Sequence, residues 1–256
     1  MKIYIKLAVA LLLTIGARAE MRTWSSLPGT PVEAEYVRIQ FDNVILKDGD
    51  GAELKIPLTS FSGEDLKYIE LENPPQLSVD VMKSADQEFI PTSPFLAKDP
   101  LNLLIYEFGA RVKQLDAKSY NYPLTIEIYA LTKQRYDQSK YHLIARAKSE
   151  PFVLSKDNGR RHEYTAPKRY KVFSYELNVD FLNWTEPRGE KYGENLILVR
   201  DERGEIIAYN STKKWLYNKL EMLDELPVGA WLNDDCVRVH PTVPKVTKKP
   251  GVSWLR

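Results

Sequence analysis

The chain has 256 residues, of which 43% are hydrophobic, and its 36 basic residues nearly balance its 35 acidic ones. This balance excludes an overall field that would attract nucleic acid or anionic lipid, so we expect no nucleic-acid partner and recognition of other partners by local features. The single cysteine, Cys236, excludes an intramolecular disulfide, and a core or cores built from this much apolar chain must hold the fold unaided.

The first 19 residues have the pattern of a cleavable secretory signal peptide. A positively charged start precedes an apolar run over 7–15, and Ala17 and Ala19 are the small residues that signal peptidase accepts. The apolar run is shorter than the ~20 residues that cross a bilayer, which argues against an uncleaved anchor. We expect cleavage before Glu20, giving a secreted or periplasmic mature chain that has neither a lipid anchor nor a membrane span.

Residues 20–71 alternate apolar and polar side chains in short runs, which is typical of strands. Two of these runs flank residues 48–51, Asp-Gly-Asp-Gly, which predict a tight hairpin because glycine adopts a positive φ without strain. A calcium site is the alternative, but the further oxygen ligands and the bidentate glutamate of a calcium loop are missing. Beyond the hairpin, Ser62 and Asp65 fit the start of a short helix.

Two prolines within residues 72–76 predict a stiff linker and a domain boundary. Strand patterns then continue through 77–238, including a hairpin whose turn lies at 201–204. Because no long helix separates these strands, they predict an antiparallel β-sandwich. One amphipathic helix is expected at 211–226, where leucines recur at i, i+4 and i+7.

Residues 239–256 alternate prolines with lysines and have little to bury. This composition predicts a flexible, basic, proline-rich tail. Binding of nucleic acid or phosphate by the tail is the alternative, but so few charges give only a weak, salt-sensitive attraction.

The first predicted domain carries an ordered series of residues spread over its length. These residues are Arg22, Trp24, Gly29, Gly51, Pro57, Leu58, Ser62, Asp65 and Tyr68. The series resembles SLA1 homology domain 1 (SHD1), a compact SH3-like β module, with Phe61 where family domains usually place a leucine. With this resemblance, the predicted fold class is mainly β: a small SH3-like β-barrel followed by an antiparallel β-sandwich with one amphipathic helix near the C-terminus.

The resemblance also implies a function. The SHD1 domain of a fungal endocytic adaptor binds short peptides with the sequence Asn-Pro-Phe-x-Asp, and copies behind a signal peptide resemble exported bacterial proteins that carry this module. A surviving groove would need a basic side chain for the peptide's aspartate and an aromatic wall for its phenylalanine. Lys47 and Lys55, on or beside the predicted hairpin, are the candidate basic residues. Ordinary solvated lysines are the alternative.

No motif nominates a catalytic residue, a metal ligand or a cofactor. The nucleophile motif Gly-x-Ser-x-Gly is absent, and His142, His162 and His240 sit in no supporting motif. Asp234 and Asp235, which precede the cysteine, follow no familiar metal-ligand spacing. We therefore expect a non-enzymatic protein that binds a protein or short peptide partner.

Two alternative functions stay open at this stage. Five tryptophans and fifteen tyrosines would suit a polysaccharide-binding platform on the sandwich, although Trp24, Trp184, Trp215 and Trp231 are interpreted first as core or interface anchors. The second alternative is a hydrolase with an unrecognised site, since a pair of carboxylates for glycoside hydrolysis is defined by spatial separation and not by a motif.

Overall fold

The computed structural model describes residues 21–25, 31–90, 101–178 and 185–243. The predicted signal peptide with its cleavage site, Gly29, Trp184 and most of the predicted tail lie outside these residues. The chain divides into two compact units, Met1–Asn73 and Pro74–Arg256, which are described separately below. Within the described ranges, no helix is long and apolar enough to cross a membrane.

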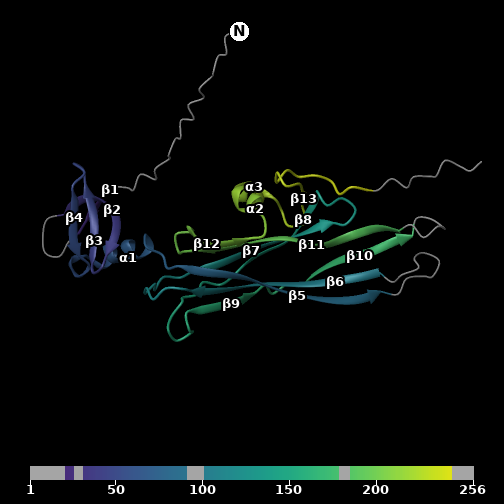
Figure 1. Ribbon diagram of the computed structural model, residues 1–256, viewed down its shortest axis with the longest axis horizontal. Coiled ribbons are helices and arrows are strands. Elements are labelled where there is room, and N and C mark those ends of the chain that lie inside the picture. Colours follow the sequence, from purple (N-terminus) through teal and green to yellow (C-terminus); the bar gives the residue numbers. More distant parts are fainter. Residues whose placement is uncertain (1–20, 26–30, 91–100, 179–184, 244–256) are drawn as a thin grey trace, which may run out of the picture. The chain divides into compact units, whose positions relative to one another are not determined.

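The first unit is a four-stranded antiparallel sheet with one helix (Figure 1). Its elements are β1 (Met21–Trp24), β2 (Val32–Gln40), β3 (Asn43–Asp48), β4 (Glu53–Pro57), the 3-10 turn η1 (Leu58–Ser60) and α1 (Gly63–Leu71). The predicted hairpin joins β3 to β4, with Gly51 at a φ of 88°. Ser62 is the N-cap of α1, and its Oγ accepts a hydrogen bond from the backbone N–H of Asp65.

The core of the first unit lies between the sheet and α1. Its fully buried side chains are Trp24, Ala34, Val44, Leu46, Phe61 and Ile69. The Trp24 ring packs edge-on against Phe61 and against Tyr68, with ring centroids 5.6 Å apart in both pairs. The indole N–H of Trp24 donates to the carbonyl of Ala34 at 2.8 Å, so this large side chain is both buried and hydrogen-bonded.

Nine strands of the second unit, all antiparallel, form one hydrogen-bonded sheet in the described residues. They are β5 (Leu77–Ile90), β6 (Leu101–Gln114), β7 (Thr125–Gln134), β8 (Tyr141–Lys148), β9 (Arg161–Thr165), β10 (Tyr170–Asn178), β11 (Thr185–Arg200), β12 (Ile206–Ser211) and β13 (Trp231–Leu232). The order is β13-β8-β7-β11-β10-β6-β5, with β12 beside β11 and β9 beside β6.

The 16-residue strand β11 joins two layers of this unit. Its first part, residues 185–189, pairs with β10, and residues 190–200 pair with β7. Figure 1 shows β7, β11 and β12 in one layer and β5, β6 and β9 in the other. Asn210 on β12 connects the layers by donating to the carbonyl of Val79 on β5 at 2.6 Å. The predicted mainly β fold, with a small unit before a larger antiparallel one, is confirmed.

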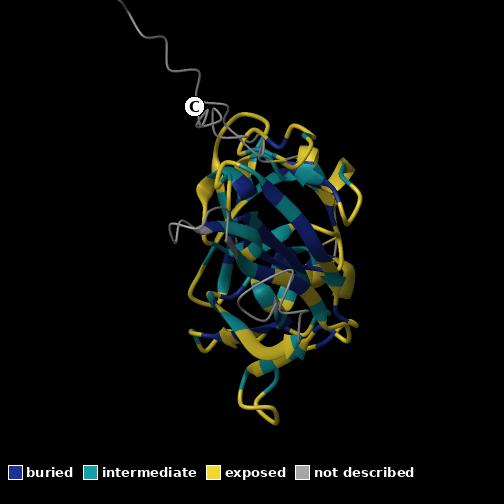
Figure 2. Ribbon diagram, turned by 90° about the vertical axis from the view of Figure 1, so that its right-hand side faces the viewer, coloured by how far each residue is buried: buried dark blue, intermediate teal, exposed yellow. Residues whose placement is uncertain are grey.

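The interior of the second unit is built from alternating strand residues. Ile126 and Ile128 on β7, with Ile197 and Val199 on β11, are at most 1% exposed. Figure 2 shows buried segments along the strands and exposed residues on the loops that connect them. Leu196 and Leu198, which alternate with Ile197 and Val199 on β11, are also fully buried, in the cluster with Leu216 and Leu223, so both faces of this strand are covered.

The prediction of one continuous helix over 211–226 is wrong. Two short helices, α2 (Lys214–Asn218) and α3 (Leu220–Glu225), are separated by Lys219, whose φ of −117° and ψ of 28° are not helical. Ser211 still belongs to β12, and Lys213 is the N-cap residue of α2. The break allows both Leu216 and Leu223 to be fully buried on one apolar cluster with leucines of β7, β8 and β11. Tertiary packing has therefore overridden the local helix pattern.

Candidate functional site

The charged residues of the SHD1-like series form a network at the junction of β1 and α1. Arg22 Nη2 donates to Asp65 Oδ1 at 3.0 Å, and Asp65 is only 2% exposed. The second carboxylate oxygen of Asp65 accepts from the Ser25 backbone N–H at 2.9 Å and from Ser62 Oγ at 2.8 Å. The Arg22 guanidinium also lies 4.5 Å from the centre of the Tyr68 ring. The network joins the start of the unit to its helix.

The other positions of the series that lie within the described residues are at bends in the chain. Gly51 completes the β3–β4 turn, where its N–H donates to the carbonyl of Asp48 at 3.0 Å. Pro57 ends β4, and the N–H of Leu58 donates to the carbonyl of Asp42 at 2.9 Å. These positions hold the backbone of the unit in place.

The face of the first sheet that points away from its core carries both candidate lysines. Successive side chains of β3 alternate, so Val44 and Leu46 enter the core while Ile45 and Lys47 lie on the opposite face. Lys55 of β4 pairs with Ile45 in the register and shares its face. The structure thus brings Lys47 and Lys55 together on one surface, which we call the outer face.

The outer face has an apolar centre surrounded by charges. Ile45 is 3% exposed although it lies between Arg38 and Lys55, whose long aliphatic stems can cover a neighbour of this kind. Arg38 is paired with Glu53, at 3.3 Å, on the same face. Among the described residues, neither Lys47 nor Lys55 has an ion-pair partner within 4.0 Å, and both are exposed. In the register, Lys47 lies opposite Glu35 and Glu53 on this face.

One exposed aromatic residue of this unit was missed by the sequence analysis. Phe41, in the turn between β2 and β3, is 86% exposed and has a φ of 56°. A bulky side chain in the left-handed region costs about 1–3 kcal/mol and is seldom found without a reason. The sequence carries only a weak signal for this position, because a phenylalanine between two apolar runs is normally interpreted as part of a buried strand.

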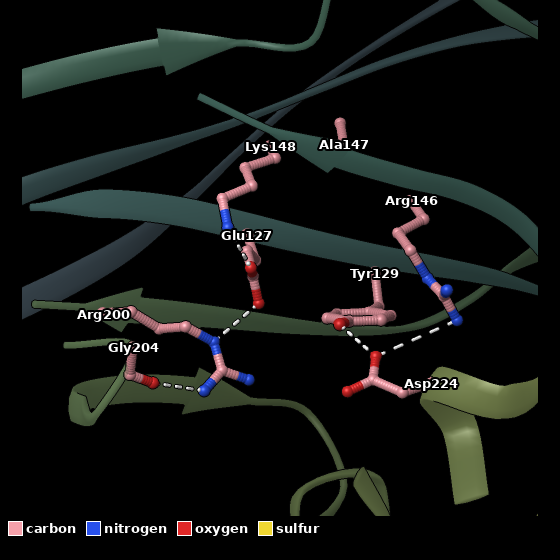
Figure 3. Close-up of a pocket in the computed structure, with 8 residues that line it drawn as sticks. All are labelled: Glu127, Tyr129, Arg146, Ala147, Lys148, Arg200, Gly204 and Asp224. Carbon is pink, nitrogen blue, oxygen red and sulfur yellow. Dashed lines mark hydrogen bonds and ion pairs between the residues drawn. The ribbon is translucent and has the colours of Figure 1, made fainter. Parts of the chain in front are cut away.

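In the second unit, a pocket of about 570 Å³ opens beside α3 (Figure 3). It is lined by Glu127 and Tyr129 of β7, Arg146, Ala147 and Lys148 of β8, Arg200 of β11, Gly204 and Asp224. Sequence analysis did not nominate these residues, since they come from four separate segments. The sequence contains one indirect sign, an apolar run over residues 196–199 of β11 that ends at Arg200.

Ionic hydrogen bonds order one end of this pocket. Glu127 accepts from Arg200 Nε at 2.8 Å and from Lys148 Nζ at 3.0 Å. Burial alone would raise the pKa of the Glu127 carboxyl, but the hydrogen bonds from Arg200 and Lys148 outweigh it and place the pKa below its ordinary value. Glu127 is therefore a fixed anion and not a proton donor near neutral pH.

At the other end of the pocket, Tyr129 donates to Asp224 Oδ1 at 2.5 Å. Burial, together with this hydrogen bond, raises the pKa of Tyr129, which keeps the phenol protonated. Arg146 Nη2 donates to the carbonyls of Leu223 at 2.7 Å and Leu226 at 3.0 Å. These contacts fasten α3 to the sheet.

His142 and His162 are not arranged as the base of a Ser-His-Asp triad. His142 Nδ1 lies 2.9 Å from Glu190, which also accepts from the hydroxyl of Thr132. The hydroxyl is therefore held by the carboxylate and not by the imidazole, unlike a nucleophile with its base. His162 stacks on Phe152, with ring centroids 3.9 Å apart. No cluster of three or more potential metal ligands occurs in the ranges that the structure describes.

The residues considered for a metal are engaged in other contacts. Asp235 accepts from Lys219 Nζ at 2.5 Å, and the carbonyl of Asp234 accepts from the same ammonium at 3.1 Å. Cys236 is buried in the apolar cluster beneath α2 and α3. His240 is exposed in the segment after β13.

Aromatic side chains are divided between the cores and the surface. Trp24 is fully buried, and Trp215 and Trp231 are partly buried. Trp231 stacks on His142 with ring centroids 4.7 Å apart. On the surface, Tyr209 is half exposed and stacks on Tyr217 with centroids 3.8 Å apart and planes 5° from parallel.

Comparisons with known proteins give a family match over the first part of the chain. No curated protein matches the chain. A crystal structure of a protein from Akkermansia muciniphila is 17% identical over 55% of this chain and 73% of its own, with a TM-score of 0.25, a likeness too weak to define the fold. Residues 16–76 match the family SLA1 homology domain 1, SHD1, which confirms the resemblance seen in the sequence and suggests a protein-interaction module.

Proposed function

We propose that this is an exported, non-enzymatic interaction or scaffolding protein whose first unit binds a protein or short peptide partner through its outer face. The observation that carries the proposal is that Lys47 and Lys55 share one face and that neither makes an ion pair within 4.0 Å in the described residues, although Glu35 and Glu53 lie opposite Lys47 in the register. The SHD1 match over this unit supports the same role.

The chemistry of the outer face favours a peptide with an acidic residue. An exposed ammonium group attracts a carboxylate with little cost, because it remains partly solvated in the complex. Arg38 lies in the same face but is paired with Glu53, so the two lysines supply the unpaired positive charge. The exposed ring of Phe41, at the β2–β3 turn and thus at the other end of β3 from Lys47, is a candidate for an apolar contact.

A peptide array probed with the mature chain tests the proposal. The array contains peptides with an aromatic residue near an aspartate, and matched peptides with asparagine instead. We expect selective retention of the acidic peptides, and at least about tenfold weaker binding by a Lys47→Glu/Lys55→Glu variant, from two reversed charge contacts of roughly 0.7 kcal/mol or more each.

The matched control is Lys213→Glu/Lys214→Glu, which reverses two exposed lysines of the second unit. This control should bind the selected peptide as the parent chain does. An array without retained peptides, or equal binding by the two double variants, would contradict the proposal.

The proposed export is tested separately. Expression of the whole chain in a bacterium, followed by fractionation and N-terminal sequencing, should give a periplasmic or secreted product that begins at Glu20. A full-length cytoplasmic product would exclude this part of the proposal without bearing on the outer face.

A second candidate function is polysaccharide binding by the second unit. It is favoured by the stacked pair of Tyr209 and Tyr217, because an exposed aromatic ring is a platform for a sugar ring. A glycan array with the mature chain and with Tyr209→Ala tests it. A signal that is lost in the variant supports polysaccharide binding, and an array without signal excludes it.

A further inference from the structure

The pocket beside α3 lies where one face of the sheet changes from apolar to charged. Leu196 and Leu198 of β11 are fully buried in the cluster under α2 and α3. Arg200 continues the same alternation on this face, and it pairs with Glu127 of the neighbouring strand at 2.8 Å. Lys148 bonds the same carboxylate from the next strand, at 3.0 Å. The helices cover the leucines and leave the charged end of the face open as the pocket.

The carboxylates of this pocket already have donors. The two oxygens of Glu127 accept from Arg200 and Lys148, and Asp224 Oδ1 accepts from Tyr129. A divalent cation would have to displace these donors to gain its oxygen ligands. The arrangement therefore does not suit a metal.

Arg200 and Lys148, in contrast, have N–H groups that make no hydrogen bond within the described residues. A guanidinium has about five N–H groups and an ammonium about three. Arg200 uses Nε on Glu127 and Nη1 on the carbonyl of Gly204, at 2.7 Å, while its Nη2 has no hydrogen-bond partner in the part of the chain described here. Figure 3 shows this nitrogen on the side of the guanidinium that faces Tyr129 and Asp224. Lys148 uses one donor and is 60% exposed.

The balance of charge in the pocket also favours an anionic ligand. Three cationic side chains, Arg146, Lys148 and Arg200, line the pocket against two carboxylates. Arg200 is held rigidly by two partners and is 19% exposed, so it offers an ordered and partly desolvated donor. Such a donor binds an anion more strongly than a freely solvated side chain does.

We propose that this pocket binds a small organic anion whose carboxylate or phosphate group accepts hydrogen bonds from Arg200 and Lys148. Its volume of about 570 Å³ lies within the range of small-molecule sites, roughly 300–1,000 Å³. Tyr129 contributes a polar aromatic wall. The proposal is independent of the peptide site on the first unit.

Isothermal titration of the mature chain with three probes tests the proposal. The probes are D-glucuronate, D-glucose 6-phosphate and neutral D-glucose. We expect at least one anion to bind, at least tenfold more tightly than glucose, with an affinity that falls as salt is added. Preference for glucuronate assigns the ligand as a carboxylate, and preference for glucose 6-phosphate as a phosphate.

Two variants locate the binding. Arg200→Gln removes the ordered donor, and Lys148→Gln removes an exposed donor at little risk to folding. Each substitution should lower the affinity for the anion at least tenfold. Arg111→Gln is the matched control, because Arg111 pairs with Glu163 at 2.6 Å on a different part of the unit. The proposal fails if neither anion binds, if glucose binds equally well, or if Lys148→Gln and Arg111→Gln have the same effect.

Discussion

Arg22, in the first strand of the first unit, donates a hydrogen bond at 3.0 Å to Asp65 in α1, although 43 residues separate them. Asp65 is 2% exposed, whereas Arg22 remains 31% exposed. The carboxylate also accepts from Ser25 and Ser62. A single buried anion therefore connects the strand, the segment after it and the helix cap.

Replacement of this anion should loosen the first unit. Asp65→Asn preserves the size of the side chain but replaces one acceptor with a donor, and we expect a loss of about 2 kcal/mol, since Arg22 is partly solvated. Hydrogen exchange of the Trp24 indole N–H, which donates to Ala34 inside this core, measures the loss. Exchange should be about thirtyfold faster than in the parent chain.

Glu64→Gln is the control for this variant, because Glu64 is the exposed neighbour in the first turn of α1. Loss of its charge near the helix N-terminus costs only about 0.3–1 kcal/mol. Equal acceleration of Trp24 exchange in both variants would show that Asp65 acts only through the helix dipole.

Two glycines with positive φ should differ sharply when each is replaced by alanine. Gly189 has a φ of 78°, and a Cβ there would lie 1.9 Å from the carbonyl oxygen of Phe173. Gly204 has a φ of 89°, but a Cβ would meet open space. Gly204→Ala should cost about 1–2 kcal/mol from the backbone alone. Gly189→Ala adds a clash with a paired strand and should cost about 4 kcal/mol or more.

Thermal unfolding of the mature chain measures both effects on the second unit. A domain of this size loses roughly 2–4 °C in Tm for each kcal/mol, so Gly204→Ala should lower Tm by a few degrees. Gly189→Ala should lower it by about 10 °C or prevent folding. Similar Tm values for the two variants would mean that β10 and β11 separate easily at this position.

The turns were predictable because their signals are local. The turn at 48–51 contains Gly51 at positive φ, and the turn at 201–204 contains Gly204. Each needs only neighbouring residues to be recognised. The helix prediction over 211–226 failed because burial of Leu216 and Leu223 on the sheet, and not helical periodicity, decides where the chain bends at Lys219.

The pocket was not predictable for a different reason. Glu127 and Asp224 lie on segments almost a hundred residues apart, and their proximity depends on which strands pair. The alternation of side chains along a strand predicts that Glu127 and Tyr129 share a face, but it does not predict which other strand or helix they contact. For the outer face, sequence analysis could predict that Lys47 and Lys55 lie near each other, because they are on the two arms of one hairpin. It could not predict the register that puts them on the same face.

Cys236 should report opening of the second unit. It is 3% exposed in the apolar cluster, and burial raises the pKa of its thiol to about 11. Because the thiolate is the reactive form, a water-soluble disulfide reagent at about pH 8 should modify the native chain slowly and the unfolded chain at once. Rapid modification of a chain whose tryptophan fluorescence shows that it is still folded would contradict the burial of this side chain.

The stability of the second unit should depend on pH through Glu127. Burial raises the pKa of this carboxyl, but the hydrogen bonds from Arg200 and Lys148 lower it below the ordinary 4.5. A carboxyl with a depressed folded-state pKa stabilises the fold above its unfolded pKa, and this stability is lost as the pH falls through the folded value.

Glu127→Gln removes this titration, so the variant should be less stable than the parent chain at about pH 6, and the difference should shrink towards about pH 3. Urea unfolding over this range measures it. Glu163→Gln, at an exposed ion pair with Arg111, should follow the parent curve within about 1 kcal/mol. A difference between Glu127→Gln and the parent chain that stays constant with pH would mean that Glu127 stabilises the sheet by packing and not by its charge.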